Sequence, residues 1–173
     1  MNSDLTIDHL NKLPQEEFTR VLADIFEHSS WIPERAWQVR PFKNTDHLHK
    51  SMVNIVEHAK LDEKLSLLCA HPQLAGKEAK SGTLTSSSTE EQSAANLNSL
   101  DRNEMDEITR LNAFYIERHG FPFIIAVKNH DKPGIFSEFR RRANNAPELE
   151  FDTALAQVAM IARFRLDALI EVA

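Results

Sequence analysis

Two short stretches of the sequence combine residue types that could transfer a proton and hold a polar ligand. His71-Pro72 supplies an imidazole beside a proline, and Ser88-Thr89-Glu90-Glu91-Gln92 supplies hydroxyl, carboxylate and amide groups. They mark the ends of residues 71–92, HPQLAGKEAKSGTLTSSSTEEQ, which follow neither the helical nor the strand period. An irregular segment of this length inside a compact domain is usually functional or disordered. Because its ends carry an imidazole and a carboxylate, we expect a functional loop.

His71 follows a predicted helix that must stop near Ala70, because Pro72 disfavours helical geometry at the residue before it. A histidine held rigidly in this way could act as a general acid or base. The alternative is a helix-terminal histidine that contacts only the last carbonyls. Position alone favours the alternative.

Ser88 and Glu91 have the spacing of a capping box, in which the serine caps the first turn and the carboxylate returns to the serine N–H. This spacing predicts a long helix that begins at Ser88 and is closed by Gly120. A carboxylate beside an amide, as in Glu91-Gln92, could also hold a urea-like group, which offers both donors and acceptors. The amides of a first turn also bind anions and polar ligands. Capping and ligand binding both stay open.

Arg165 lies on the apolar stripe of the last predicted helix, whereas Arg163 points outward. The stripe consists of Phe151, Leu155, Val158, Ala162, Arg165 and Leu169. Arginine is rarely buried without a partner. Arg165 therefore forms either an internal ion pair or a two-point contact with a ligand carboxylate.

The remaining chemistry-bearing residues do not form a recognised motif. His47 and His49 are two residues apart and His58 lies nine further on, which does not match the i, i+4 pairs of a zinc helix. We therefore expect no metal. The sequence has no Gly-rich phosphate loop, nucleophile elbow or basic-aromatic nucleic-acid patch.

Helical periodicity dominates the chain, which has only four glycines and no Asn-Gly or Asp-Gly dipeptide. Besides the segments above, helices are predicted for residues 6–13, from Pro14 to Phe26, from a cap at Thr45 to Ala59, from Asp62, after Gly134 and from Pro147. In the helix from Asp62, Leu65, Leu68 and Cys69 are expected to face inward. In the helix after Gly134, the inward residues are expected to be Ile135, Phe136 and Phe139. The run Arg140-Arg141-Arg142 is expected to be a solvated helix end.

One apolar run is too short for a buried helix. Residues 121–127, FPFIIAV, are therefore predicted to be extended and fully buried. The sequence thus predicts an all-α fold for residues 1–173: a single compact multi-helix domain with a long irregular loop and one short buried extended segment.

Composition narrows the class of protein. The net charge of −6 and pI near 5.7 give no reason to expect nucleic acid or an anionic membrane as a partner. No stretch approaches the roughly 18 apolar residues of a membrane span. The single cysteine, Cys69, fits a reducing compartment, so a cytoplasmic location is expected. The oligomeric state stays open, a homodimer included.

Taken together, these stretches resemble the OHCU decarboxylase family, whose members convert 2-oxo-4-hydroxy-4-carboxy-5-ureidoimidazoline (OHCU) to (S)-allantoin and CO2 in urate degradation. The resemblance covers nearly the whole chain and rests on the order and spacing of several motifs. They are Trp31 to Phe42 with its Arg-Pro-Phe end, His71 to Gly76, Ser88 to Gln92, Leu111-Asn112-x-x-Tyr115, Gly120 to Lys128, and Ile161-Ala162-x-x-Arg165-Leu166.

This resemblance implies an all-helical enzyme with a small-molecule substrate and no cofactor. It implies that His71 and Glu91 are catalytic. It further implies that the substrate is bound by Pro72, Ser88, Thr89, Glu90, Gln92, Phe123, Ile124, Ile125, Ala126, Val127 and Arg165, with the 123–127 segment contributing its backbone.

Two alternative functions belong to other classes of protein. One is a helical interaction module whose serine-rich loop docks a partner; it predicts an exposed apolar patch and no convergent polar cavity. The other is a metal-dependent hydrolase built on His47, His49 and His58, which an assay showing no bound zinc would exclude.

Overall fold

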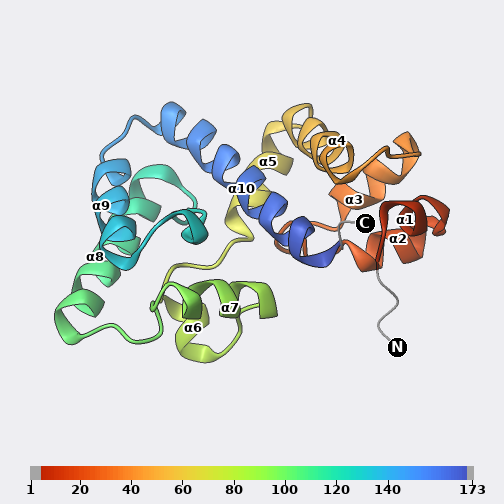
Figure 1. Ribbon diagram of the computed structural model, residues 1–173. Coiled ribbons are helices and arrows are strands. Elements are labelled where there is room, and N and C mark those ends of the chain that lie inside the picture. The colour runs from red at the N-terminus through yellow and green to blue at the C-terminus, as the bar shows by residue number, and fades with distance from the viewer. Residues whose placement is uncertain (1–4, 171–173) are drawn as a thin grey trace. The chain divides into compact units, whose positions relative to one another are not determined.

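The computed structural model describes residues 5–170, and this part of the chain consists of helices and loops without a strand (Figure 1). The predicted all-α class is therefore confirmed. The helices are α1 (Ile7–Lys12), α2 (Gln15–Val21), α3 (Trp31–Ala36), η1 (Trp37–Val39), α4 (Thr45–Glu57), α5 (Leu61–Cys69), α6 (Lys77–Ser81), α7 (Ser86–Ala94), α8 (Arg102–His119), η2 (Val127–Asn129), α9 (Lys132–Ala143) and α10 (Pro147–Leu169). None of the described helices is long and apolar enough to cross a membrane.

The chain divides into two compact units. Among the described residues, the first contains 5–67 and 159–170, and the second contains Leu68–Val158. Helices α5 and α10 each contribute residues to both units.

In the first unit, α3 packs against α2 and α4 around a core of apolar side chains. The fully buried members include Phe18, Leu22, Ile32, Leu48 and Met52. Most of these lie on the stripes predicted from the 3.6-residue period, although α2 ends at Val21 and leaves residues 22–26 in turns. Asn44, and not Thr45, is the N-cap of α4, because its side chain accepts from the His47 N–H.

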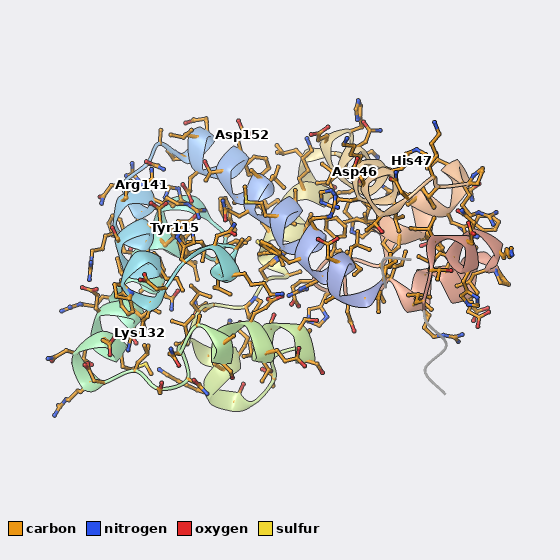
Figure 2. The ribbon with its side chains drawn as sticks, viewed as in Figure 1. Asp46, His47, Tyr115, Lys132, Arg141 and Asp152 are labelled. Atoms are coloured by element: carbon orange, nitrogen blue, oxygen red, sulfur yellow. The ribbon has the colours of Figure 1, made fainter. Side chains whose placement is uncertain are left out.

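In the second unit, α8 and α9 pack side by side (Figure 1). Tyr115 of α8, labelled in Figure 2, is fully buried and meets the rings of Phe121, Phe123 and Phe139 edge-on at centroid distances of 5.4–5.9 Å. Phe123 stacks on Phe139 at 3.9 Å. This aromatic cluster fixes residues 121–123 against α8 and α9.

The structure corrects the prediction that residues 71–92 are irregular. They include the short helix α6 and most of α7. Helix α7 begins at Ser86, where Thr85 is the N-cap and accepts from the N–H of Ser88 at 3.2 Å. Ser88 is therefore not the capping residue, and Ser88 and Glu91 lie inside the helix.

The predicted single helix from Ser88 to Gly120 is also wrong, because α7 ends at Ala94 and α8 begins at Arg102. The capping box of the region is Asp101 with Glu104: Asp101 accepts from the Glu104 N–H at 2.8 Å, and Glu104 accepts from the Asp101 N–H at 3.1 Å. The predicted end at Gly120 is correct; this glycine has a φ of +80°.

Three burial predictions fail. Leu169, the last member of the predicted stripe on α10, is 38% exposed. Arg142 does not belong to a solvated helix end: its residue surface is 1% exposed, whereas Arg141, labelled in Figure 2, is exposed and pairs with Glu138. On α5, Leu65 and Cys69 are exposed, and the buried residues are Leu67 and Leu68. The predicted inward residues of α9, Ile135, Phe136 and Phe139, are buried.

Candidate active site

His71 lies just beyond the last residue of α5, as the proline after it requires. Its main-chain N–H donates to the carbonyl of Leu68 at 3.2 Å, and the residue is only 7% exposed. Pro72 is partly exposed. The imidazole is therefore carried by a short, largely buried connection whose backbone is fixed on both sides.

Two buried amide side chains hold the loop that follows Pro72. Gln92 of α7 accepts from the N–H of Ala75 at 2.9 Å and donates to the carbonyl of Gln73 at 3.3 Å. Asn112 of α8 donates to the carbonyl of Leu74 at 3.0 Å. Three consecutive loop residues are thus attached to two helices of the same unit.

The loop itself has little freedom. Ala75 has a φ of +47°, in the left-handed region that non-glycine residues seldom occupy. Gly76 has an ordinary φ of −95°, but a Cβ at this position would lie 2.3 Å from the Cβ of Gln73. Glycine is therefore required at residue 76 by the closeness of the Gln73 side chain and not by backbone conformation.

Helix α7 presents its site candidates on two different faces. Ser88 and Gln92, four residues apart, are buried, and Glu91 is partly exposed. Thr89 and Glu90 are exposed. Gln92 uses one of its two amide hydrogens on Gln73, so the second hydrogen is without a partner among residues 5–170.

The segment from Phe123 to Val127 is buried along its whole length. Its main chain is held at two points: Arg142 donates from Nη1 to the carbonyl of Ile124 at 2.8 Å, and Gln157 of α10 accepts from the N–H of Ala126 at 2.9 Å. Helix α7 packs against η2, which begins at Val127. The structure therefore brings one end of this segment next to the Ser88–Gln92 helix.

A buried network of hydrogen bonds and an ion pair holds the Arg142 side chain. Nε of Arg142 donates to Oε1 of Glu150 at 2.8 Å, and Nη2 forms an ion pair with the same oxygen. Tyr115 donates to that oxygen at 2.6 Å and Asn145 donates to the other at 3.1 Å. Burial, together with the hydrogen bond to Glu150, raises the pKa of Tyr115, so the phenol stays a neutral donor.

Arg165 belongs to the first unit, where it is 9% exposed. Its guanidinium donates to a carboxylate oxygen of Glu27 at 2.9 Å and to the carbonyl of Asp24 at 3.0 Å. Glu27 is itself 2% exposed. Arg165 is buried, as the apolar stripe predicts, and it forms the internal ion pair that was one of its two predicted roles. Arg163 is more exposed and pairs with Asp46 and Asp167.

The histidines considered as metal ligands hydrogen-bond to main-chain atoms. Nδ1 of His47 accepts from the Lys43 N–H, His49 contacts the carbonyl of Ala159, and His58 contacts the carbonyl of Asn54. In residues 5–170 there is no group of three or more His, Cys, Asp or Glu side chains arranged to hold a metal ion.

Comparison with known proteins decides the family. The family model for OHCU decarboxylase matches residues 11–167. The chain belongs to the OHCU decarboxylase family. The 2-oxo-4-hydroxy-4-carboxy-5-ureidoimidazoline decarboxylase of Haloferax volcanii is 39% identical over 163 residues, which cover 94% of this chain and 95% of that protein. The uric acid degradation bifunctional protein PucL of Bacillus subtilis is 41% identical over 161 residues, 93% of this chain but 32% of the bifunctional protein.

Solved structures agree with membership of the OHCU decarboxylase family. The crystal structure of (S)-allantoin synthase superposes with a TM-score of 0.79 at 32% identity, covering 96% of this chain and 54% of that one. The crystal structure of OHCU decarboxylase in the presence of (S)-allantoin superposes with a TM-score of 0.69, covering 86% of this chain and 96% of that one. At 19% identity the second likeness shows the shared fold alone.

Within the OHCU decarboxylase fold, the second unit contains every candidate site residue except Arg165. Four side chains that hold these candidates in place were not predicted from the sequence: Asn112, Arg142, Glu150 and Gln157. Arg142 could have been found, since it follows Ile135 and Phe139 at helical spacing and so lies on their buried face. Gln157 had no comparable signal, because it is a partly exposed polar residue between two stripe positions.

Proposed function

We propose that this chain catalyses the cofactor-free decarboxylation of OHCU to (S)-allantoin and CO2, a carboxy-lyase reaction of urate degradation. The observation that carries the proposal is membership of the OHCU decarboxylase family over residues 11–167, a range that includes all thirteen candidate site residues. Family membership also supports a single functional domain, because one family match spans both compact units.

The substrate's own chemistry makes a cofactor unnecessary. Many decarboxylases pass the electron pair of the broken C–C bond to a cofactor. In OHCU, that pair forms a C=C bond with the neighbouring ring carbon, and the pair of the adjacent C=N moves onto nitrogen, which takes a proton. The resulting enol loses its hydroxyl proton and gains a proton at the ureido-bearing carbon. The face on which this last proton arrives sets the enantiomer.

We assign the proton transfer to His71, because its imidazole is carried by a fixed, largely buried connection. Glu91 is the second catalytic group and lies on α7, the same helix that holds the loop after His71. Ser88, Thr89, Glu90 and Gln92 of that helix bind the ureido arm, with Pro72 beside them. The backbone of residues 123–127 binds the remaining polar groups. Arg165, in the first unit, is proposed separately as a substrate ligand. Most of the benefit comes from positioning the substrate.

The decisive experiment follows freshly generated OHCU by ultraviolet absorbance and circular dichroism, with and without the protein. We expect faster loss of OHCU and formation of one enantiomer of allantoin. A racemic product formed at the uncatalysed rate would refute the proposed function. A cytoplasmic location and a homodimer stay predictions, which fractionation and light scattering would test.

A further inference from the structure

Ile125 lies in the middle of the buried segment 121–127 and is 4% exposed. Neither its main-chain N–H nor its C=O has a hydrogen-bond partner among residues 5–170. Most buried main-chain polar groups in proteins are paired, and each unpaired group needs an explanation. A donor and an acceptor on one residue complement a ligand group that carries both C=O and N–H, such as a ureido or ring amide.

The directions of these two groups are set by the residues on either side. The C=O of Ile124 and the N–H of Ile125 belong to one planar peptide unit, and in a trans peptide they point in opposite directions. Arg142 holds that C=O at 2.8 Å. Likewise the C=O of Ile125 shares a peptide unit with the N–H of Ala126, which Gln157 holds at 2.9 Å. Arg142 and Gln157 therefore each hold one end of a peptide unit. The other end of that peptide unit is the unpaired N–H or C=O of Ile125.

Arg142 is held by a buried ion pair with Glu150. Arg142 is 1% exposed and its guanidinium is paired with Glu150, which is 0% exposed. The guanidinium carbon, Cζ, lies 4.5 Å from the ring centre of Phe123. Replacing a buried ion pair by well-packed apolar residues is often neutral or stabilising. Retaining one here is explained if the rigid, forked donor is needed to fix the direction of the Ile124 carbonyl.

We propose that Arg142 and Gln157 are positioning residues that hold the N–H and C=O of Ile125 in fixed directions, ready to bind the amide-type group of the substrate. This inference rests on the proposed function, since it names how residues 123–127 of the same site are kept ready for a ligand. Neither side chain is assigned a contact with the reacting atoms.

Gln157 gives the cleaner test, because it is partly exposed and belongs to no ion pair. Gln157→Leu removes the acceptor for the Ala126 N–H, whereas Gln157→Glu keeps an oxygen at the same place. Thr153→Val is the matched control: it removes a local hydrogen bond of 2.8 Å to Leu149 on the same helix and does not touch the segment. Melting temperatures of all three establish folding before kinetics are measured.

For OHCU decarboxylation we expect Gln157→Leu to raise KM about tenfold, with kcat changed less than about threefold, because a misdirected Ile125 weakens ground-state and transition-state binding alike. Gln157→Glu should recover most of the loss, and Thr153→Val should match the wild type. A Gln157→Leu variant with the KM of the wild type would overturn the inference. An inactive wild type would instead refute the proposed function, so the two failures are distinguishable.

A second measurement does not use Gln157→Leu and covers the case in which that variant does not fold. The amide resonance of Ile125 is followed in the wild-type protein during titration with (S)-allantoin. We expect the Ile125 amide resonance to shift saturably as (S)-allantoin is added to the wild type. The substitution Gln157→Glu alone should move this resonance by less than ligand binding does. Saturable binding that leaves Ile125 unmoved would overturn the inference.

Discussion

Oε1 of Gln92 accepts a hydrogen bond of 2.9 Å from the N–H of Ala75, the fourth residue after His71. The same side chain donates to the carbonyl of Gln73, so one residue of α7 holds both sides of the turn that follows the proposed catalytic histidine. The loop after His71 and helix α7, both proposed parts of the site, are therefore held together by this one side chain. A change in Gln92 should alter folding and turnover together.

Gln92→Ala tests this connection. It leaves the buried N–H of Ala75 without a partner, so the free energy of unfolding should fall by about 1–3 kcal/mol. Turnover should fall as well, since the loop that carries His71 is loosened. Urea unfolding and OHCU kinetics on the same sample check both effects. A stable but inactive variant would show that Gln92 acts on the ligand only.

His71→Ala removes the proposed proton-transfer group. We expect turnover to fall roughly 10²–10⁴-fold, the usual range for a positioned acid–base residue, with little change in melting temperature. His58→Ala is the matched control, because His58 is an exposed histidine that contacts only the carbonyl of Asn54 and should be replaceable. Full activity in His71→Ala would return His71 to a helix-terminal role.

Glu91→Gln tests whether the negative charge of Glu91 is needed for activity. Since Thr85 caps α7, Glu91 has no capping duty, and the variant should fold normally while losing activity. Thr85→Ala should do the opposite: it should cost about 1 kcal/mol of stability and leave the chemistry of the folded fraction intact. Thermal melts and turnover numbers for both variants give a two-way comparison, and normal turnover in Glu91→Gln would remove Glu91 from the mechanism.

The ion pair of Arg165 with Glu27 gives the two arginines of α10 different expected behaviour. Arg165→Ala leaves a buried carboxylate unpaired and should cost about 3–5 kcal/mol of stability. Arg163→Ala removes only exposed pairs and should change stability by about 0.5 kcal/mol or less. Loss of activity in Arg165→Ala is therefore not by itself informative about the substrate.

Arg165→Lys separates the effect on stability from the effect on substrate binding. It keeps a positive charge opposite Glu27 but loses the planar two-point donor. If the guanidinium also binds substrate, this variant should melt near the wild type and still lose most of its activity. Normal kinetics in a stable Arg165→Lys protein would limit Arg165 to its ion pair. Differential scanning fluorimetry and steady-state kinetics are sufficient.

A pH effect is expected in the first unit. Hydrogen bonds from Arg35, and then from the Lys60 N–H, lower the pKa of Glu63 from 4.5 to about 2. A carboxyl group whose pKa is lowered by folding stabilises the protein above its unfolded pKa, and this contribution is lost as pH falls from 4.5 toward 2. The wild type should therefore exceed Glu63→Gln in urea midpoint at neutral pH, by a small amount because the pair is exposed. The difference should shrink on acidification and in high salt; a constant difference would contradict the assignment.

Periodicity was a good guide where one face of a helix is apolar. It placed Phe18, Met52 and Phe139 in the core, and it identified Arg165 as a buried cation before any partner was known. It failed for Arg142 because three consecutive arginines looked like a solvated end, although only one of them continues the stripe. The same rule, applied residue by residue, would have separated Arg142 from its neighbours.

Local polar motifs were a weaker guide. Ser88-x-x-Glu91 and Asp101-x-x-Glu104 both fit a capping box, and only the second is one. The sequence could not choose between them, because the choice depends on where α7 ends and on which hydroxyl reaches the first free N–H. The amide contacts of Gln92 and Gln157 were likewise invisible, since they join residues 17 to 31 positions apart to main-chain atoms that every residue possesses.

The contact between Gly76 and the side chain of Gln73 limits which sequences can build this loop. Any side chain at residue 76 would have to displace Gln73, whose N–H and carbonyl are engaged with Glu78 and Gln92. Mutational tolerance should therefore be uneven along the loop: exposed Lys77 is free to vary, whereas its neighbour is not. A related chain that keeps the histidine and the glutamate but carries a side chain at residue 76 is therefore expected to hold this loop in a different shape, with the proposed proton-transfer group aimed elsewhere.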